Sequence, residues 1–283
     1  MATKTAQYTT DDIEYLRHGD RPMMLRLYRP AGAGPFPGVI DLHGGAWNNG
    51  SLKQCHDRAE VFAEAGLAVA ALDFRHAADG YPTSLVDINY SVRWLKAHAK
   101  DLRIDPERIA LSGQSSGGHL AMLAAMRPND ARYASIPVGD GKLDARVVCV
   151  GMSWPVINPL SRYRNALSAR AQANPPDWVG DIPEHHDTYW KTEANMAEGN
   201  PVLMLERGEK VEMPPALWVN GRPDPVHDYL DPESGGDLRE PERFAKLYRA
   251  AGGKIDMVYI EQKTRSTRTS FDPLAAFFRK HLL

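Results

Sequence analysis

Apolar runs and helical spacings alternate along most of the chain. Residues 39–42 and 67–74 are apolar nearly throughout, which is typical of strands covered on both faces. In 84–99 the apolar residues recur every three or four positions, which predicts a helix. Strands that alternate with helices predict a mostly parallel sheet with helices on both faces. The further elements expected from these patterns are strands over 23–29, 109–111, 146–152, 216–220 and 255–260, and helices over 117–126, 240–251 and 273–282.

Segment 154–215 breaks this alternation. It contains repeated prolines, many aromatic and charged residues, and no evident strand. A stretch of that length inside a compact domain is expected to be functional or to form a small unit of its own. We therefore predict a lid of short helices at 154–215, inserted after the sixth strand into a core formed by 1–153 and 216–283.

Composition narrows the classes of partner. The chain of 283 residues has a formal net charge of −2 and no basic stripe, which argues against a nucleic-acid or anionic membrane partner. The polar start, 1–15, predicts no secretory signal, and no apolar run is long enough to span a membrane. Cys55 and Cys149 lie far apart and predict reduced thiols in a cytoplasmic protein, with no metal site and no cofactor. A small-molecule substrate is the expected partner, and a homodimer stays open.

The pentapeptide GQSSG at 113–117 carries the sharpest chemical signal. It joins the strand expected at 109–111 to the helix expected at 117–126. Gly-x-Ser-x-Gly between a strand and a helix is typical of a nucleophile elbow, in which the middle serine is exposed on a strained turn. Ser115 is therefore the candidate nucleophile. The alternative is a chance glycine–serine turn, which this context disfavours.

A second motif, HGGAW at 43–47, follows an apolar strand directly. Glycines allow backbone amides to approach a ligand closely, and an oxyanion needs two or more such donors. The amides of Gly45, Ala46 and Ser116 are the candidate donors. We interpret His43 as a residue that fixes this loop by a structural hydrogen bond rather than as the catalytic base.

These motifs, with DFR at 73–75 and DPERIALSGQSSGGHLA at 105–121, resemble the α/β-hydrolase superfamily. More narrowly, HGGAW is similar to the HGG-x-W motif of hormone-sensitive-lipase-like esterases and arylformamidases. The resemblance implies an α/β-hydrolase fold with an eight-stranded sheet and hydrolysis of esters or amides without a metal. It also implies a triad in the chain order serine, acid, histidine, with the acid after the strand that follows the lid. Asp224 occupies that position.

The histidine that the resemblance implies is missing. It should follow the last strand, but YIEQKTRSTRTSF at 259–271 contains none. Without a base, a serine hydroxyl is a weak nucleophile at neutral pH. His227, three residues after Asp224, is our preferred replacement, and His185 and His186 in the lid are alternatives. Two further possibilities stay open: a non-hydrolytic enzyme of the lyase or isomerase type that uses Glu261, Asp224 or a lid histidine, and a pseudoenzyme that only binds a ligand.

The same loop suggests contacts to substrate. Arg265 and Arg268 could clamp a carboxylate, although a solvated basic loop is the simpler interpretation. We also name Trp47 and Trp154 as candidate substrate contacts, because small-ligand sites are usually lined by aromatic side chains. Together the residues predict a serine hydrolase that cleaves a small carboxylic ester or amide through an acyl-enzyme on Ser115, with a relocated base.

Overall fold

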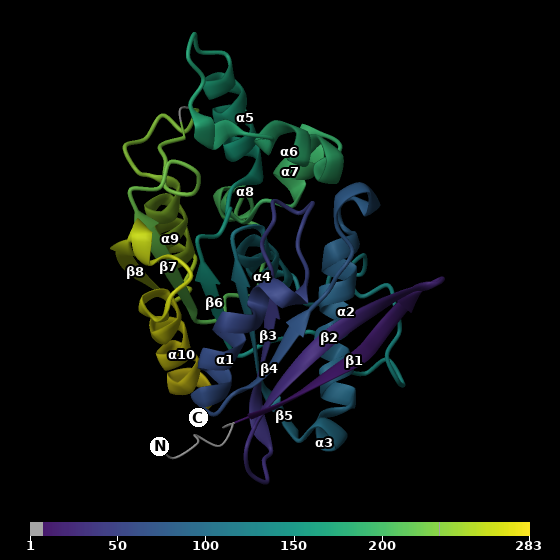
Figure 1. Cartoon of the computed structure of the whole chain (residues 1–283). Coiled ribbons are helices and arrows are strands. Elements are labelled where there is room, and N and C mark those ends of the chain that lie inside the picture. The colour runs from purple at the N-terminus through teal and green to yellow at the C-terminus, as the bar shows by residue number, and fades with distance from the viewer. Residues whose placement is uncertain (1–7, 232) are drawn as a thin grey trace.

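An eight-stranded sheet forms the centre of the molecule (Figure 1). The computed structural model describes residues 8–231 and 233–283. The first seven residues, part of the start expected to lack a secretory signal, lie outside this description. In the order along the sheet, the strands are β1 Tyr8–His18, β2 Arg21–Pro30, β4 Ala68–Leu72, β3 Phe36–Leu42, β5 Ile104–Gln114, β6 Val150–Ser153, β7 Ala216–Arg222 and β8 Ile255–Glu261.

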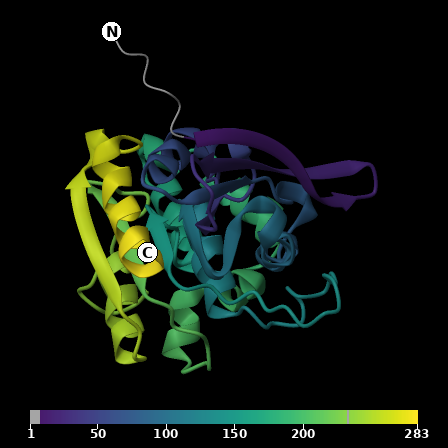
Figure 2. The ribbon, with the colours of Figure 1, turned by 90° about the horizontal axis from the view of Figure 1, so that it is seen from below.

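The sheet is mostly parallel, as the sequence predicts. β1 and β2 form an antiparallel hairpin, and β2 also pairs antiparallel with β4. All the other neighbouring strands pair in parallel. Figures 1 and 2 show the hairpin at one edge of the sheet and β8 at the opposite edge. β1 was not predicted, because much of it is exposed and polar and has no continuous apolar run.

Helices cover both faces of the sheet, and neighbouring strand residues point to opposite faces. The helices of this core are α1 His56–Glu64, α2 Thr83–Ala97, α3 Ala99–Leu102, α4 Ser116–Met126, α9 Glu240–Ala250 and α10 Arg268–Leu282. Ile40 belongs to the apolar cluster that includes side chains of α2, α4 and α9, whereas Val39 belongs to the one that includes side chains of α1 and α10. This alternation is the two-residue period of a strand that is buried on both faces.

The last helix begins earlier than the sequence suggests. We expected α10 to start at Pro273, because proline is favoured in the first turn of a helix. The helix starts at Arg268 and carries Pro273 inside it. Phe271 is 5% exposed, so the additional turn buries an apolar side chain against the core that α1 and α10 share.

Segment 154–215 is a helical insertion after the sixth strand. It contains α5 Pro159–Arg170, α6 Ile182–Trp190, α7 Glu193–Glu198 and α8 Pro201–Glu206. Figure 1 shows α5, α6 and α7 grouped above one end of the sheet. The insertion has a small core of its own, and the partly buried Val226, from the segment after β7, packs against it. None of the helices in the described part of the chain has the length and apolar character needed to cross a membrane.

Candidate active site

Ser115 sits on a sharp turn between β5 and α4. Its backbone has φ 54° and ψ −119°, a conformation that is strained for any residue other than glycine. Glycines make the turn possible, since a Cβ on Gly113 would lie 2.2 Å from the carbonyl oxygen of Gly117, and one on Gly117 would lie 2.4 Å from that of His43. The side chain of Ser115 is partly exposed at the start of α4. The local sequence therefore builds the elbow that GQSSG predicts.

The loop after β3 is packed tightly against this turn. A Cβ on Gly44 would come within 3.3 Å of the Cβ of Ser115. Gly45 has φ 112°, and a Cβ there would lie 1.9 Å from the carbonyl oxygen of Asn49, so only glycine fits. Among the described residues, no acceptor takes the backbone amides of Gly45 or Ala46. The amide of Ser116 is also available, because the first amides of a helix have no partner within it.

His43 holds this loop in place. Its ring is 2% exposed and lies parallel to the ring of Phe74, with centroids 4.3 Å apart. Its Nδ1 lies 2.8 Å from the carbonyl oxygen of Gly44, the kind of structural hydrogen bond expected from the sequence. Burial lowers the pKa of His43 to about 4, so the ring is neutral at neutral pH.

Asp224 and His227 share one turn after β7. The Asp224 Oδ1 atom accepts hydrogen bonds from the backbone amides of Val226 at 2.9 Å and His227 at 3.2 Å. The Oδ2 atom accepts a hydrogen bond from the His227 ring Nδ1 at 2.8 Å. Because a carboxylate only accepts, Nδ1 carries the proton and Nε2 has a free lone pair. The Nε2 atom of His227 lies 3.1 Å from the Oγ atom of Ser115.

The environment keeps the His227 ring neutral. Burial lowers the pKa of His227 to about 4, although the hydrogen bond and the charge of Asp224 act in the opposite direction. The positive charges of Arg265 and Arg162 lower the pKa further. Burial by itself raises the pKa of Asp224, but its contacts with His227 and Val226 and the charge of Arg265 bring it below the usual value. The pair is therefore an ionised carboxylate and a neutral imidazole at neutral pH.

The basic loop after β8 is divided between two environments. Arg265 is half-buried, and its guanidinium carbon lies 5.2 Å from the centroid of the Trp154 ring. Lys263 forms an ion pair with Glu261 at 2.6 Å, and both side chains are largely exposed. Arg268 is exposed and pairs with Glu64 of α1. Of the two arginines proposed from the sequence to clamp a carboxylate, only Arg265 lies beside the Asp224–His227 pair.

The two tryptophans named as substrate contacts are buried instead. Trp47 is 1% exposed, and its Nε1 atom donates a hydrogen bond to His119 at 3.3 Å. Trp154 is fully buried, and its Nε1 atom donates to Gln262 at 2.9 Å. Neither ring presents surface to a ligand in this structure. Both support the site, because Trp47 directly follows the loop that carries the Gly45 and Ala46 amides, here called the amide loop (residues 43–46), and Trp154 lies beneath Arg265.

The alternative histidines of the insertion make other contacts. His186 is fully buried, and its Nδ1 atom donates to the carbonyl oxygen of Ile182 at 2.7 Å. The carbonyl oxygen of His185 accepts a hydrogen bond from Asn48, the residue after Trp47, so α6 is tied to the amide loop. Among the described residues, the only cluster with metal-ligand spacing is His56, Asp57 and Glu60 on the surface of α1, none of which belongs to the site.

Arg162 of α5 is a residue near this site that was not predicted from the sequence. Its side chain is 4% exposed and lies over Trp47, with its guanidinium carbon 6.0 Å from the ring centroid. The charge of Arg162 acts on His227. No sequence motif marks this arginine. A signal that could have found it is the start of its helix, where Asn158-Pro159 forms a typical N-cap followed by a favourable first residue, three residues before Arg162.

The sequence model of the BD-FAE family matches residues 25–226, which is well over half of the chain. The chain belongs to the BD-FAE family. The matched range includes Ser115, the amide loop and Asp224, and it ends one residue before His227.

Curated relatives of this BD-FAE family member include carboxylic ester hydrolases. The carboxylic ester hydrolase LipN of Mycobacterium tuberculosis is 28% identical over 251 residues, covering 84% of this chain and 59% of LipN. The probable carboxylic ester hydrolase LipM of the same organism is 35% identical over 127 residues, covering 43% of this chain and 29% of LipM. The chain therefore spans less than two thirds of the length of either relative.

Solved structures show the same fold. EstE1, a thermophilic carboxylesterase cloned from a metagenomic library, superposes with a TM-score of 0.74 at 23% identity, covering 97% of this chain and 90% of EstE1. A bacterial heroin esterase superposes with a TM-score of 0.74 at 20% identity, covering 98% of this chain and 85% of the esterase. The α/β-hydrolase fold expected from the motifs is thereby confirmed.

Proposed function

We propose that this protein is a serine hydrolase that cleaves a small carboxylic ester through an acyl-enzyme on Ser115. The observation that carries the proposal is a chain of two hydrogen bonds: the Ser115 hydroxyl donates to His227 Nε2 at 3.1 Å, and His227 Nδ1–H donates to the Asp224 carboxylate at 2.8 Å. The named activities of LipN and LipM support an ester as the substrate. In this proposal the base follows β7 and replaces the histidine expected after β8.

Acylation begins when the Ser115 Oγ atom attacks the carbonyl carbon of the ester. The proton of the hydroxyl moves to the Nε2 atom of His227, which is neutral and unprotonated there at neutral pH. The imidazolium that forms is stabilised by the Asp224 carboxylate, which already holds Nδ1–H. His227 then gives its proton to the leaving alcohol oxygen as the bond from carbon to that oxygen breaks.

The negative charge on the carbonyl oxygen needs donors that are already in place. The amides of Gly45, Ala46 and Ser116 are proposed for this role, because they have no acceptor among the described residues and lie on the two turns that meet at Ser115. The start of α4 adds the positive end of a helix dipole. Deacylation repeats the sequence with water as the nucleophile and His227 as its base, which releases the acid and restores Ser115.

The helical insertion is proposed to act as a lid over this site. Its support is the grouping of α5–α7 above one end of the sheet and the contact of Val226, the neighbour of His227, with the core of the insertion (Figure 1). A cover of this kind limits water around the reacting groups and strengthens the electrostatic interactions among them.

The test combines turnover with a covalent probe. The wild-type protein is expected to hydrolyse members of a panel of p-nitrophenyl esters and to form a fluorophosphonate adduct that peptide mapping locates on Ser115. Ser112→Ala, a buried serine on β5, serves as the matched control and should keep the adduct. Ser115→Ala should lose both adduct and turnover. An unlabelled wild-type protein, or full activity of Ser115→Ala, would contradict the proposal and favour a ligand-binding pseudoenzyme or a non-hydrolytic reaction.

A further inference from the structure

Arg162 is a buried cation that lies over the Trp47 ring and forms no ion pair among the residues that the structure describes. Its side chain is 4% exposed, and its Nε and Nη1 atoms are buried with no hydrogen-bond partner among the described residues. Removing an unpaired charge from water costs several kcal/mol, so such a residue is rarely kept for stability. A buried guanidinium with free donors is instead suited to a ligand that brings the opposite charge.

The side chains of the other buried arginines in the described chain are hydrogen-bonded, although only Arg58 has a charged partner. Arg58 is 2% exposed and donates from Nε to both carboxylate oxygens of Asp41 at 2.9 Å. Arg93 is 5% exposed and donates to the side chain of Asn89 at 2.9 Å and to the carbonyl oxygen of Ile136 at 2.8 Å. Arg162 therefore differs from the arginines that this protein uses for structure.

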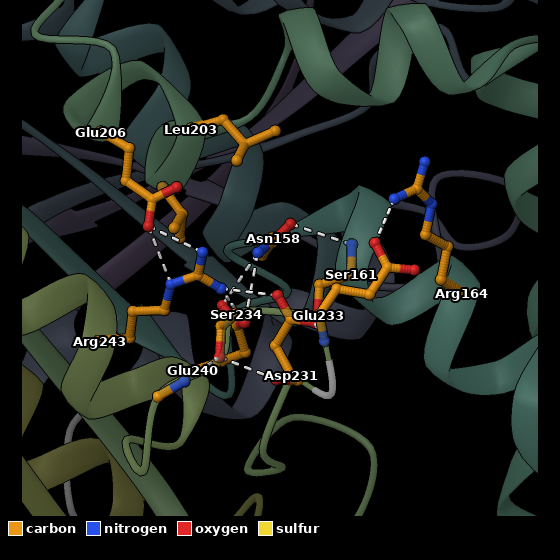
Figure 3. A network of polar contacts seen from close by, with 12 residues as sticks. Asn158, Ser161, Arg164, Leu203, Glu206, Asp231, Glu233, Ser234, Glu240 and Arg243 are labelled. Carbon is orange, nitrogen blue, oxygen red and sulfur yellow. Dashed lines mark hydrogen bonds and ion pairs between the residues drawn. The ribbon is translucent and has the colours of Figure 1, made fainter.

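The position of Arg162 is fixed by the start of its helix. Asn158 caps α5, because its Oδ1 atom accepts the backbone amide of Ser161 at 3.0 Å. Its Nδ2 atom donates to the buried Glu240 carboxylate at 3.2 and 3.3 Å, as Figure 3 shows. Arg243 binds Glu240 at 3.0 Å and joins it to Asp231 and Glu206 (Figure 3). The backbone amide of Arg162 donates a hydrogen bond to the carbonyl oxygen of Asn158 at 3.1 Å. The network around Asn158 therefore helps to fix the backbone position of Arg162.

A second arginine, on another element, acts electrostatically on Arg162 and on His227. Arg265, from the loop after β8, has no carboxylate partner among the described residues, unlike its neighbours Lys263 and Arg268. Burial lowers the pKa of both Arg162 and Arg265, that of Arg162 to about 10; Tyr229 and Asp224 act in the opposite direction on Arg162, and Asp224 does so on Arg265. Each guanidinium therefore lies within electrostatic reach of Asp224, on which the catalytic pair depends.

Asp224 does not neutralise both arginines. Its oxygens already accept three hydrogen bonds, from Val226 and from the backbone and ring of His227. Arg162 and Arg265 also repel each other, since the charge of Arg265 lowers the pKa of Arg162. Two guanidiniums that share one occupied carboxylate leave an excess of positive charge beside Ser115 and His227. A second anion at this position removes the repulsion and satisfies the free donors of Arg162.

We propose that Arg162 and Arg265 bind a carboxylate of the substrate, so that the ester cleaved at Ser115 carries a second, ionised carboxyl group. This inference rests on the proposed serine hydrolase function and narrows its substrate class. Carboxylate matches the planar fork of a guanidinium, and one such group between two arginines balances the single excess charge. The site selects such esters over neutral ones, because a neutral substrate leaves both cations unpaired.

Matched pairs of esters test the selectivity. Monoethyl succinate, adipate and suberate are compared with ethyl butyrate, hexanoate and octanoate, so that each pair differs by the free carboxylate on the acyl side. Acetyl esters of ω-hydroxy acids are compared with alkyl acetates for the alcohol side. Wild-type kcat/KM should favour the charged ester of at least one pair by about tenfold or more, the range of a charge-assisted hydrogen bond. Preference for the neutral ester in every pair would overturn the proposal.

Variants assign the preference to the two arginines. Arg162→Met and Arg265→Met should each lower the ratio of charged to neutral kcat/KM by about tenfold or more, chiefly through a higher KM for the charged ester. Arg164→Met is the matched control, because Arg164 lies on the same helix but pairs with Glu193 and Glu233 on the surface. The control should keep the wild-type ratio. A ratio that is equal in wild type and Arg162→Met would contradict the assignment.

A binding measurement separates this proposal from the proposed function. Adipate should raise the Tm of Ser115→Ala, and it should not do so in Ser115→Ala with Arg162→Met. Protection by inorganic phosphate but by none of the dicarboxylates would overturn the choice of carboxylate. If fluorophosphonate labels Ser115 but charged esters are not preferred and dicarboxylates do not bind, the proposed carboxylate site is contradicted and the serine hydrolase function is still supported. If dicarboxylates bind through Arg162 but Ser115 stays unlabelled, the serine hydrolase function is contradicted and the proposed carboxylate site is supported.

Discussion

The Asp224 carboxylate holds both the ring and the backbone of His227. Its Oδ2 atom accepts the ring Nδ1–H at 2.8 Å, and its Oδ1 atom accepts the backbone amide of the same residue at 3.2 Å. One carboxylate therefore fixes both the position of the His227 backbone and the orientation of its ring. Acid and base then need only the turn after β7, which explains how the loop after β8 can consist of basic and hydroxyl residues without a histidine.

Replacing this carboxylate should disable the base. Asp224→Asn keeps the size of the side chain but removes the charge and places an amide group where an acceptor is needed. The His227 ring would then favour the tautomer with its proton on Nε2, facing Ser115, and kcat should fall by roughly 10⁴-fold, as for other triads. Steady-state kinetics on the best ester, with circular dichroism to check folding, give the measurement. A loss of less than about tenfold would show that Asp224 does not orient the base.

The acid limb of the pH profile should reflect the lowered pKa of His227. His227 acts as a base only when neutral, so kcat/KM should rise as pH increases through its pKa of about 4 and be level at neutral pH. Arg265→Gln removes a positive charge that lowers this pKa, so its acid limb should lie at higher pH. A wild-type limb near the ordinary histidine value of about 6.5 would contradict this environment for His227. Intrinsic fluorescence at each pH identifies any loss caused by unfolding.

Buried neutral histidines should make the fold sensitive to acid. Burial lowers the pKa of His43, His119 and His227 to about 4 and that of His186 to about 3, below the unfolded value near 6.5. Their stabilisation is complete above pH 6.5 and is lost progressively as pH falls from 6.5 to the folded pKa values. Each contributes up to about 1.4 kcal/mol per pH unit within this window.

Urea unfolding between pH 7 and pH 4 measures this slope. His119→Gln retains a donor for the carbonyl oxygen of Gly199, which His119 Nε2 contacts at 2.8 Å, but cannot titrate. It should reduce the slope by up to about 1.4 kcal/mol per pH unit. A free energy of unfolding that does not change over this range would contradict the neutral, buried state of these rings.

Two buried arginines should respond to the same substitution in opposite ways. Arg58→Met leaves the buried carboxylate of Asp41 without its ion pair and should lower the free energy of unfolding by about 3–5 kcal/mol. Arg162→Met removes a buried charge whose Nε and Nη1 atoms have no hydrogen-bond partner among the described residues, and it should leave the protein equally stable or stabilise it by up to about 4 kcal/mol. Urea unfolding without ligand gives both values. A destabilisation by Arg162→Met as large as that of Arg58→Met would mean that Arg162 is a structural residue.

Local patterns predicted the features that local geometry determines. The turn at Ser115 depends on Gly113 and Gly117, and the amide loop depends on Gly45, so short motifs were enough to predict both. Apolar runs located most strands for the same reason. The strand β1 was not predicted, because most of its residues are exposed and polar and it forms by pairing with β2 rather than by burial of an apolar run.

For features that depend on contacts between distant segments, the sequence could only reduce the number of candidate residues. The sequence put His227 first among several histidines, but its approach to Ser115 depends on the turn after β7 lying beside the end of β5, on the other side of β6. The importance of Arg162 depends on the absence of a partner, which no sequence motif displays. Trp47 and Trp154 are of a residue type that often lines pockets. Both are nevertheless buried, because the insertion and the loop after β8 cover them.

The central claim is that His227 activates Ser115, and the rate of covalent labelling tests it without knowledge of the substrate. Fluorophosphonate adducts are followed by intact mass for wild type, His227→Gln and the insertion control His185→Gln. We predict one adduct per chain on Ser115 in wild type and in the control, and a labelling rate at least about 10³-fold lower in His227→Gln, because removing a triad histidine abolishes most nucleophile activation. Equal labelling rates in wild type and His227→Gln would contradict the account.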